Sequence, residues 1–280
     1  MSRALKPALW FLVALSAVYG LTVWTAIGQS AENTLMASQA HPARTFVWSR
    51  SMGLPPLRWG SVTLAMGVIL IAVVALMRRR RREGIAGVGI AVVTVTTAEV
   101  LHAALPRPGL VDSPQWLTSA SFPSGTVAIT AGLALGAVVV CSPRTRPYAA
   151  AVGALWLAIT AAAVQALSWH RPSDVLGTTL LACACHAVAM RLLGPAATGG
   201  TRRIRAVPPL ALAAAGALLA SGRGDSVERT LVFAGVAFVC STLLWTTATG
   251  RRFGLRRASS ASSPGHSRTS VGTVRNEGPF

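Results

Sequence analysis

The sequence predicts an all-α protein, a polytopic membrane helix bundle. Hydrophobic residues make up 52% of the 280-residue chain and charged residues only 12%, with a mean hydropathy of +0.54. Soluble domains carry about twice that share of charge. Eight apolar stretches are long enough to cross a bilayer, and the basic residues alternate between the segments that separate them. These observations place the chain in the membrane class before any single residue is interpreted.

The predicted spans follow one another along most of the chain. They lie near residues 8–28, 59–77, 84–104, 124–142, 148–168, 173–193, 207–221 and 230–248. The first is longer than the apolar core of a typical signal peptide, so we interpret it as a spanning helix. In the segment after it, about 29–58, we recognise no chemistry. The tail at 249–280 is rich in Ser, Gly and Arg, and we expect it to be disordered.

The distribution of Lys and Arg predicts the orientation of the bundle. The segment before the first span and every second inter-span segment after it, including the tail, hold 19 of the 26 basic residues. The remaining inter-span segments hold 7. The positive-inside rule then places both termini in the cytoplasm. Anionic lipid headgroups account for the net charge of +18. Only 6% of residues are aromatic, and no basic face alternates with stacking rings, so we do not expect nucleic-acid binding.

The cysteines indicate packing and not a metal site. The four thiols all lie in or at the end of apolar runs, where a thiol behaves as a small hydrophobic group. Cys183, Cys185 and His186 have the composition of a metal cluster. However, they occupy one continuous apolar helix, in which residues two apart point away from each other. We therefore expect neither a metal nor a cofactor, and no disulfide framework.

Polar side chains gather in three segments that the predicted topology brings to one outer face. These segments are 99–108, 121–126 and 168–174. Polar groups near a bilayer are costly and usually have a function. The near absence of Lys beside abundant Arg and Ala is typical of a GC-rich bacterial genome, so we expect a bacterial cell membrane. The outer face would then look towards the periplasm or cell wall.

Two of these segments have the chemistry of an anion site. Ser124, Gly125 and Thr126 open a helix, where free backbone N–H groups and the positive end of the helix dipole favour an anion. Arg107 lies between two prolines, and its planar guanidinium suits a phosphate. Taken singly, these residues are also typical of an ordinary helix start and a lipid-headgroup anchor. Their predicted convergence favours a site for phosphate or a similar anion.

The third segment holds a possible nucleophile. His170 and Asp174 are four residues apart at a helix start, and therefore on one helical face. A carboxylate in that position can hold one imidazole nitrogen and leave the other free to attack. The same pair is also compatible with a role limited to capping the helix.

These residues resemble the motifs of the type 2 phosphatidic acid phosphatase family, which shares its fold with the vanadium haloperoxidases. That family carries Lys-x6-Arg-Pro, Pro-Ser-Gly-His and Ser-Arg-x5-His-x3-Asp on a six-helix membrane core. Motif order and spacing match here across residues 59–193, most closely from Trp169 to Gly177. The resemblance implies that His170 forms a phosphohistidine, with Asp174 orienting it. It also implies that Arg107 and the backbone at Ser124–Gly125 hold the phosphate oxygens.

The chain departs from the family pattern at several charged positions. Val100 stands at the place of the first-motif lysine, and Thr126 stands at the place of the histidine that protonates the leaving group. Ala163 and Val164 replace the Ser-Arg pair of the third motif. We consider His102 and Arg171 as replacements for the missing charge, and His102 also as a replacement acid. Without a positioned acid, we expect lipid diphosphates to be preferred over lipid monophosphates.

The sequence thus predicts four parts and a leading function. The parts are a first span with its loop (1–58), a phosphatase-like six-helix core (59–193), two additional spans (194–248) and a basic cytoplasmic tail (249–280). We expect an outward-facing phosphatase that acts on a lipid phosphate or diphosphate. One alternative is a catalytically degenerate relative that binds phospholipid headgroups or an envelope partner. Another is a transporter that uses Glu99 and His186, although no paired broken helices support it.

Overall fold

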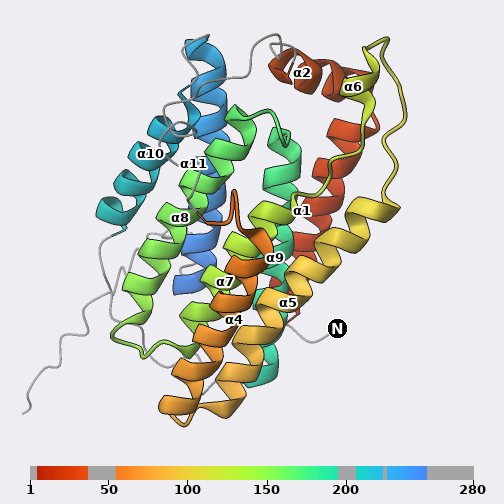
Figure 1. Ribbon diagram of the computed structural model, residues 1–280. Coiled ribbons are helices and arrows are strands. Elements are labelled where there is room, and N and C mark those ends of the chain that lie inside the picture. The colour runs from red at the N-terminus through yellow and green to blue at the C-terminus, as the bar shows by residue number, and fades with distance from the viewer. Residues whose placement is uncertain (1–4, 37–54, 195–205, 223–225, 251–280) are drawn as a thin grey trace, which may run out of the picture.

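The computed structural model describes residues 5–36, 55–194, 206–222 and 226–250. All regular secondary structure in these ranges is helical, which confirms the predicted all-α class. The helices are α1 (Lys6–Val23), α2 (Ala26–Met36), α4 (Gly60–Met77), α5 (Arg81–Ala104), α6 (Gln115–Thr118), α7 (Gly125–Val140), α8 (Arg146–Ala166), α9 (Pro172–Leu193), α10 (Val207–Ser221) and α11 (Val227–Thr249). The long helices run side by side along one bundle axis (Figure 1). Of the predicted tail, Thr249 ends α11 and Gly250 caps it, and residues 251–280 lie outside the described residues.

Six of the eight predicted spans are long and apolar enough to cross a membrane in the described part of the chain. They are α1, α4, α5, α8, α9 and α11. These helices fit a multi-pass membrane protein. The other two predicted spans, α7 and α10, have only 16 and 15 residues. A helix of that length rises about 24 Å, which is less than the roughly 30 Å of a bilayer's hydrocarbon core.

The start of the chain differs from the prediction. The first predicted span, 8–28, ends as α1 at Val23, and a separate helix, α2, begins at Ala26. Thr25 assists this break, because its hydroxyl accepts a hydrogen bond from the Gly28 N–H at 3.0 Å. Figure 1 shows α2 lying across the top of the bundle beside α6, at the same end as the loops that join α5 to α7 and α8 to α9. The segment in which we recognised no chemistry therefore supplies a helix to this end.

Helix α7 is the centre of the bundle and packs against α4, α5, α8 and α9. Its closest neighbour is α5, and small residues allow that approach. A Cβ added at Gly87 of α5 would overlap the carbonyl of Gly136, and one added at Gly136 would overlap the carbonyl of Gly87. One helical turn away, a Cβ added at Gly132 would lie 3.1 Å from the Ala91 Cα. Small residues four apart let the two backbones meet, as in other membrane helix pairs.

The last two helices are part of the same core. Buried residues of α10 and α11 belong to one hydrophobic cluster with residues of α7, α8 and α9. Phe233, Leu244 and Trp245 of α11 are almost completely buried. The Ser241 hydroxyl donates to the Ala154 carbonyl of α8 at 2.9 Å. Helices outside the family resemblance therefore support the helices that carry its motifs.

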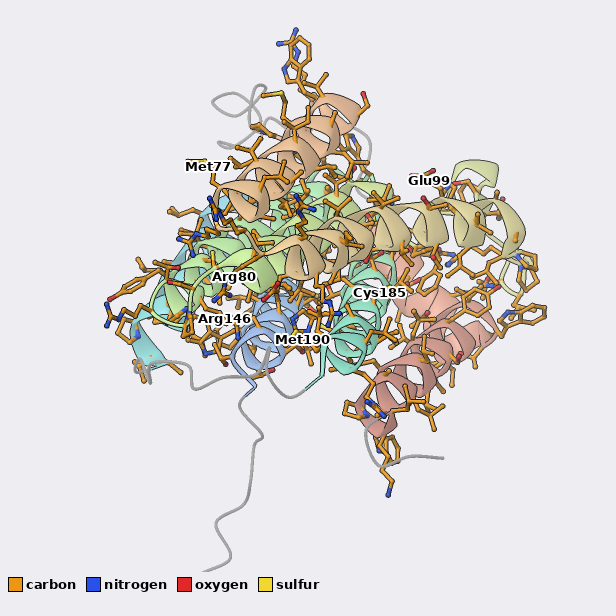
Figure 2. The ribbon with its side chains drawn as sticks, turned by 90° about the horizontal axis from the view of Figure 1, so that it is seen from below. Met77, Arg80, Glu99, Arg146, Cys185 and Met190 are labelled. Atoms are coloured by element: carbon orange, nitrogen blue, oxygen red, sulfur yellow. The ribbon has the colours of Figure 1, made fainter. Side chains whose placement is uncertain are left out.

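Basic residues lie at the end of the bundle opposite to α2. Figure 2 views that end and labels Arg80, at the α4–α5 turn, and Arg146, at the start of α8. Arg80 lies 3.9 Å from the Glu83 carboxylate. The arginine run 78–82 and the three polar segments of the sequence analysis thus lie at opposite ends of the bundle (Figure 1).

A glycine in the third motif is required by close packing. A Cβ added at Gly177 of α9 would overlap the ring of Phe122, which is 4% exposed. We expect Gly177→Ala to destabilise the fold by about 1–3 kcal/mol, as overpacking of a core typically does. Thermal unfolding in detergent measures this, with Gly89→Ala as control, because nothing lies within 4 Å of a Cβ at Gly89. Equal unfolding temperatures for the two variants would contradict this packing.

Candidate functional site

The turn from α8 to α9 positions His170 beside Asp174. Pro172 is the first residue of α9, and Asp174 accepts a hydrogen bond from the Arg171 N–H at 2.8 Å, which caps the helix. The same carboxylate oxygen lies 3.5 Å from His170 Nδ1. The Asp174 side chain is fully buried, whereas the His170 side chain is 16% exposed. No hydrogen bond to His170 Nδ1 is formed among the described residues, so the pair is a close approach of this nitrogen to a buried carboxylate, and Nε2 is not part of it.

The start of α7 is fastened to the first turn of α9. Ser124 caps α7, since its hydroxyl accepts from the Val127 N–H at 3.3 Å. The Ser124 N–H donates to the Thr178 hydroxyl at 2.7 Å, and that hydroxyl donates to the Asp174 carbonyl at 2.6 Å. The structure thus brings the second and third motifs together. The N–H of Ser124 is used in this contact, and its hydroxyl is used in the cap of α7.

The next residues of α7 face a carboxylate. Gly125 and Thr126 are partly exposed. A Cβ added at Gly125 would overlap Oε1 of Glu99, so the Glu99 carboxylate lies against the backbone there. A negative group is favoured at this positive helix end. An anion bound at Gly125 would therefore have to share the helix end with Glu99.

Arg107 meets α9 through an acidic residue that the sequence analysis did not identify. Its guanidinium Nη1 donates to Oε2 of Glu32, from α2, at 3.3 Å. Oε1 of Glu32 accepts from the Ser173 N–H, at the second position of α9, at 3.2 Å. The Arg107 and Glu32 side chains are only 5% and 6% exposed. Glu32 thus links the first motif to the third.

One face of α2 carries polar side chains into the protein. The buried residues are Gln29, Glu32, Asn33 and Met36, a spacing of three, four and seven residues. Gln29 Nε2 donates to the Pro108 carbonyl at 2.6 Å, and Asn33 Nδ2 donates to the Ser113 hydroxyl at 2.9 Å. The only available sequence signal was this helical spacing of polar residues directly after the first span.

The Glu32 carboxylate is held at an electrostatic cost. Burial raises the pKa of Glu32 above its ordinary value, and the Asp174 carboxylate raises it further. The hydrogen bonds from Ser173 and the charge of Arg107 lower this pKa, but not enough to offset the burial. The pKa of Glu32 therefore stays above its ordinary value despite the close contact with Arg107. Such an arrangement is more typical of a functional group than of a stabilising ion pair.

The two predicted replacement groups lie elsewhere. Arg171 anchors the loop before α7: its guanidinium donates to the carbonyls of Leu117 at 2.6 Å and Ser119 at 3.2 Å, and to the Ser121 hydroxyl. His102 lies exposed in the last turn of α5. Among the described residues, it forms no hydrogen bond or ion pair with His170, Asp174 or Arg107.

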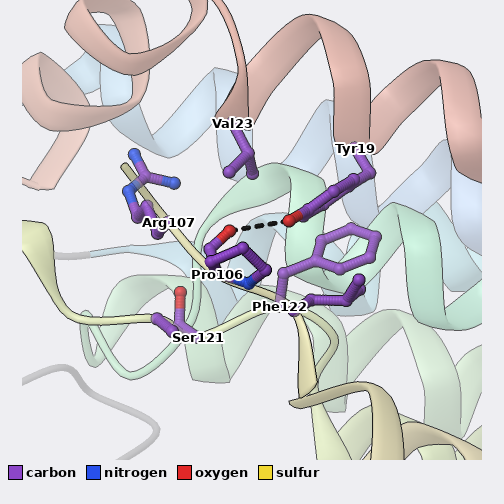
Figure 3. Close-up of a pocket in the computed structure, with 8 residues that line it drawn as sticks. Tyr19, Val23, Pro106, Arg107, Ser121 and Phe122 are labelled. Carbon is purple, nitrogen blue, oxygen red and sulfur yellow. Dashed lines mark hydrogen bonds between the residues drawn. The ribbon is translucent and has the colours of Figure 1, made fainter. Parts of the chain in front are cut away.

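A small pocket borders Arg107. It lies between α1 and the two loops at 105–107 and 120–122 (Figure 3). Its lining is mainly apolar: Tyr19, Val23, Leu105, Pro106, Arg107, Ala120, Ser121 and Phe122. The Tyr19 hydroxyl donates to the Pro106 carbonyl at 2.6 Å, and the Tyr19 ring packs on Phe122 with centroids 5.2 Å apart. An apolar surface and a cation therefore lie side by side.

The described residues contain no group of three or more His, Cys, Asp or Glu side chains placed to hold a metal ion. Cys183, which the sequence places beside Cys185 and His186, is fully buried within the main hydrophobic cluster. No family model, curated protein or solved structure matches this chain. A functional proposal therefore depends on the chemistry of the site.

Proposed function

We propose that the protein is an integral membrane phosphatase that hydrolyses a lipid phosphate or diphosphate, with His170 as the nucleophile. One observation carries the proposal. The imidazole of His170 lies 3.5 Å from the buried Asp174 carboxylate at the start of α9, a helix start that Glu32 links to Arg107 and that Thr178 links to the start of α7. The motif resemblance supports the same assignment. From the distribution of basic residues, we infer that the site faces outwards and that both termini are cytoplasmic.

The reaction would take place in two steps. Asp174 holds Nδ1–H of His170, and Nε2 attacks the phosphorus atom, so that a P–N bond forms while the bond to the leaving oxygen breaks. Arg107 and the Gly125 backbone at the start of α7 would stabilise the charge on the phosphoryl oxygens. Water then attacks phosphorus and the P–N bond breaks, which releases inorganic phosphate and regenerates His170. These two reaction steps need no metal ion or cofactor.

The surroundings of the site favour a lipid substrate. The pocket beside Arg107 is mainly apolar and is bounded by α1, a membrane-capable helix of which little is buried in the bundle. An apolar chain attached to a phosphate near Arg107 would therefore have an apolar surface beside it. The substrate would then approach sideways from the bilayer.

The leaving group provides the first test. Thr126 occupies the place of the family's acid, so a leaving group that departs as an anion should react faster. A phosphate leaving group, with a second pKa of about 6, needs less help than an alcohol. We expect dioleoylglycerol diphosphate to release phosphate at least about tenfold faster than dioleoyl phosphatidic acid. Release of inorganic phosphate by the purified protein measures both rates, and equal rates would refute this leaving-group argument.

One feature favours a second function, the binding of phospholipid headgroups without hydrolysis. Ala163 and Val164, at the places of the family's Ser-Arg pair, are 2% and 0% exposed within the hydrophobic cluster. No cation can reach the site from those positions. In a binding protein, His170→Ala would change headgroup affinity without affecting turnover, because no turnover would occur. Phosphate release by the wild-type protein discriminates between the two functions.

A further inference from the structure

The Glu32 carboxylate is bound in the way that proteins bind a phosphate. One of its oxygens accepts from the Arg107 guanidinium at 3.3 Å, and the other accepts from the Ser173 N–H at 3.2 Å. Ser173 lies in the first turn of α9, where the helix dipole and free N–H groups attract anions. An arginine together with a helix start is a common phosphate-binding combination.

A second observation is a donor on Arg107 that Glu32 does not satisfy. Nη2 of Arg107 is buried and has no hydrogen-bond partner among the described residues. The Arg107 side chain is 5% exposed, so bulk water does not readily compensate for this donor. Glu32 already uses one oxygen on Arg107 Nη1 and the other on Ser173. A tetrahedral anion offers additional oxygens, and one of them can accept from Nη2.

We propose that Arg107 and the Ser173 N–H form a phosphate subsite that Glu32 occupies in the resting protein, so that a phosphate binds by displacing the Glu32 carboxylate. The inference rests on the proposed function, because it adds Ser173 and a competing internal anion to the same site. A carboxylate and a phosphate cannot share these donors without strong repulsion. Since Glu32 belongs to α2, entry of a phosphate is coupled to this helix, which Gln29 and Asn33 hold to the 105–113 stretch.

The burial of Glu32 agrees with this role. Burial raises its pKa above the ordinary value, so these surroundings disfavour the ionised carboxylate relative to water. A carboxylate held at such a cost is easier to displace than one in a stabilising pair. Removal of its charge should therefore leave the fold intact and free Arg107 for an external anion.

Binding of inorganic phosphate to the full chain in nanodiscs of zwitterionic lipid, measured by calorimetry, tests the proposal. We expect Glu32→Gln to bind phosphate at least about tenfold more tightly than the wild-type protein. Glu32→Ala should show the same gain and serves as a second variant if the glutamine variant does not fold. Glu228→Gln is the matched control, because Glu228 is exposed at the start of α11, at the same end of the bundle. The gain should disappear when Arg107→Gln is added to Glu32→Gln.

The outcomes separate this subsite from the phosphatase activity. Wild-type or weaker affinity in a folded Glu32 variant would overturn the proposal, as would failure of both variants to fold, since Glu32 would then be a structural anchor. Phosphate binding needs no turnover, and the gain should persist in the Glu32→Gln/His170→Ala double variant. If Glu32→Gln binds phosphate more tightly but the wild-type protein releases no phosphate from any lipid, the subsite proposal stands and the proposed phosphatase activity is refuted.

Discussion

Replacement of His170 by alanine is expected to stop phosphate release from both lipid substrates. The imidazole is the only histidine side chain that the described structure places against the buried Asp174, and no neighbouring group can form the same P–N bond. Loss of the nucleophile in enzymes that use covalent catalysis typically lowers kcat by about 10⁴-fold or more. Phosphate release at saturating dioleoylglycerol diphosphate measures the effect. The unfolding temperature should change little, because His170 is partly exposed.

A matched histidine variant controls for this result. His266 lies in the C-terminal tail, outside the described residues, and His266→Ala should retain the wild-type rate. If His170→Ala kept a tenth or more of the wild-type turnover, His170 would not be the nucleophile. The catalytic part of the proposal would then be wrong.

We expect Asp174→Asn to lower kcat by about 10³- to 10⁴-fold, as in other enzymes in which a buried aspartate orients a catalytic histidine. Asparagine has the same shape, and its side-chain oxygen can still accept from the Arg171 N–H that caps α9. It cannot stabilise a positive charge on the imidazole or fix its tautomer as a carboxylate does. The loss should therefore appear in kcat, with KM nearly unchanged.

The control for this variant is Asp112→Asn, because Asp112 is exposed in the loop after α5. That variant should behave as wild type. A large fall in the unfolding temperature that accompanies the loss of kcat would mean that Asp174 acts as a helix cap only. Unchanged turnover in Asp174→Asn would remove the carboxylate from the mechanism.

The long apolar helices were predictable from the sequence because each has enough consecutive apolar residues to cross a bilayer. Helix α7 shows the limit of that approach. Its composition is that of a spanning helix, but it has 16 residues and is buried at the centre of the bundle. Apolar composition does not distinguish contact with lipid from contact with other helices. For the same reason, the sequence did not reveal that α10 and α11 share one core with α7, α8 and α9.

The candidate site was partly accessible from sequence. Residues at fixed spacing on one element, such as His170 and Asp174, were expected on one helical face because of helical geometry, and these two side chains lie 3.5 Å apart. Glu32 was missed because it lies 75 residues from Arg107, and no local pattern connects them. Arg171 was considered as a free cation, but its guanidinium is taken up by the loop that includes Leu117 and Ser119. Sequence spacing can identify a candidate residue, but tertiary contacts determine whether its charge is available to bind a ligand.

The most direct test of the central claim is to trap the covalent intermediate. The protein would be mixed with dioleoylglycerol diphosphate labelled at the terminal phosphate, quenched in alkali within milliseconds to seconds, digested and analysed by mass spectrometry. The account predicts a phosphohistidine at His170 that survives alkali, is lost in acid, and is absent from His170→Ala. Phosphate release without a labelled residue, or with the label on another residue, would contradict the assignment of His170 as the nucleophile.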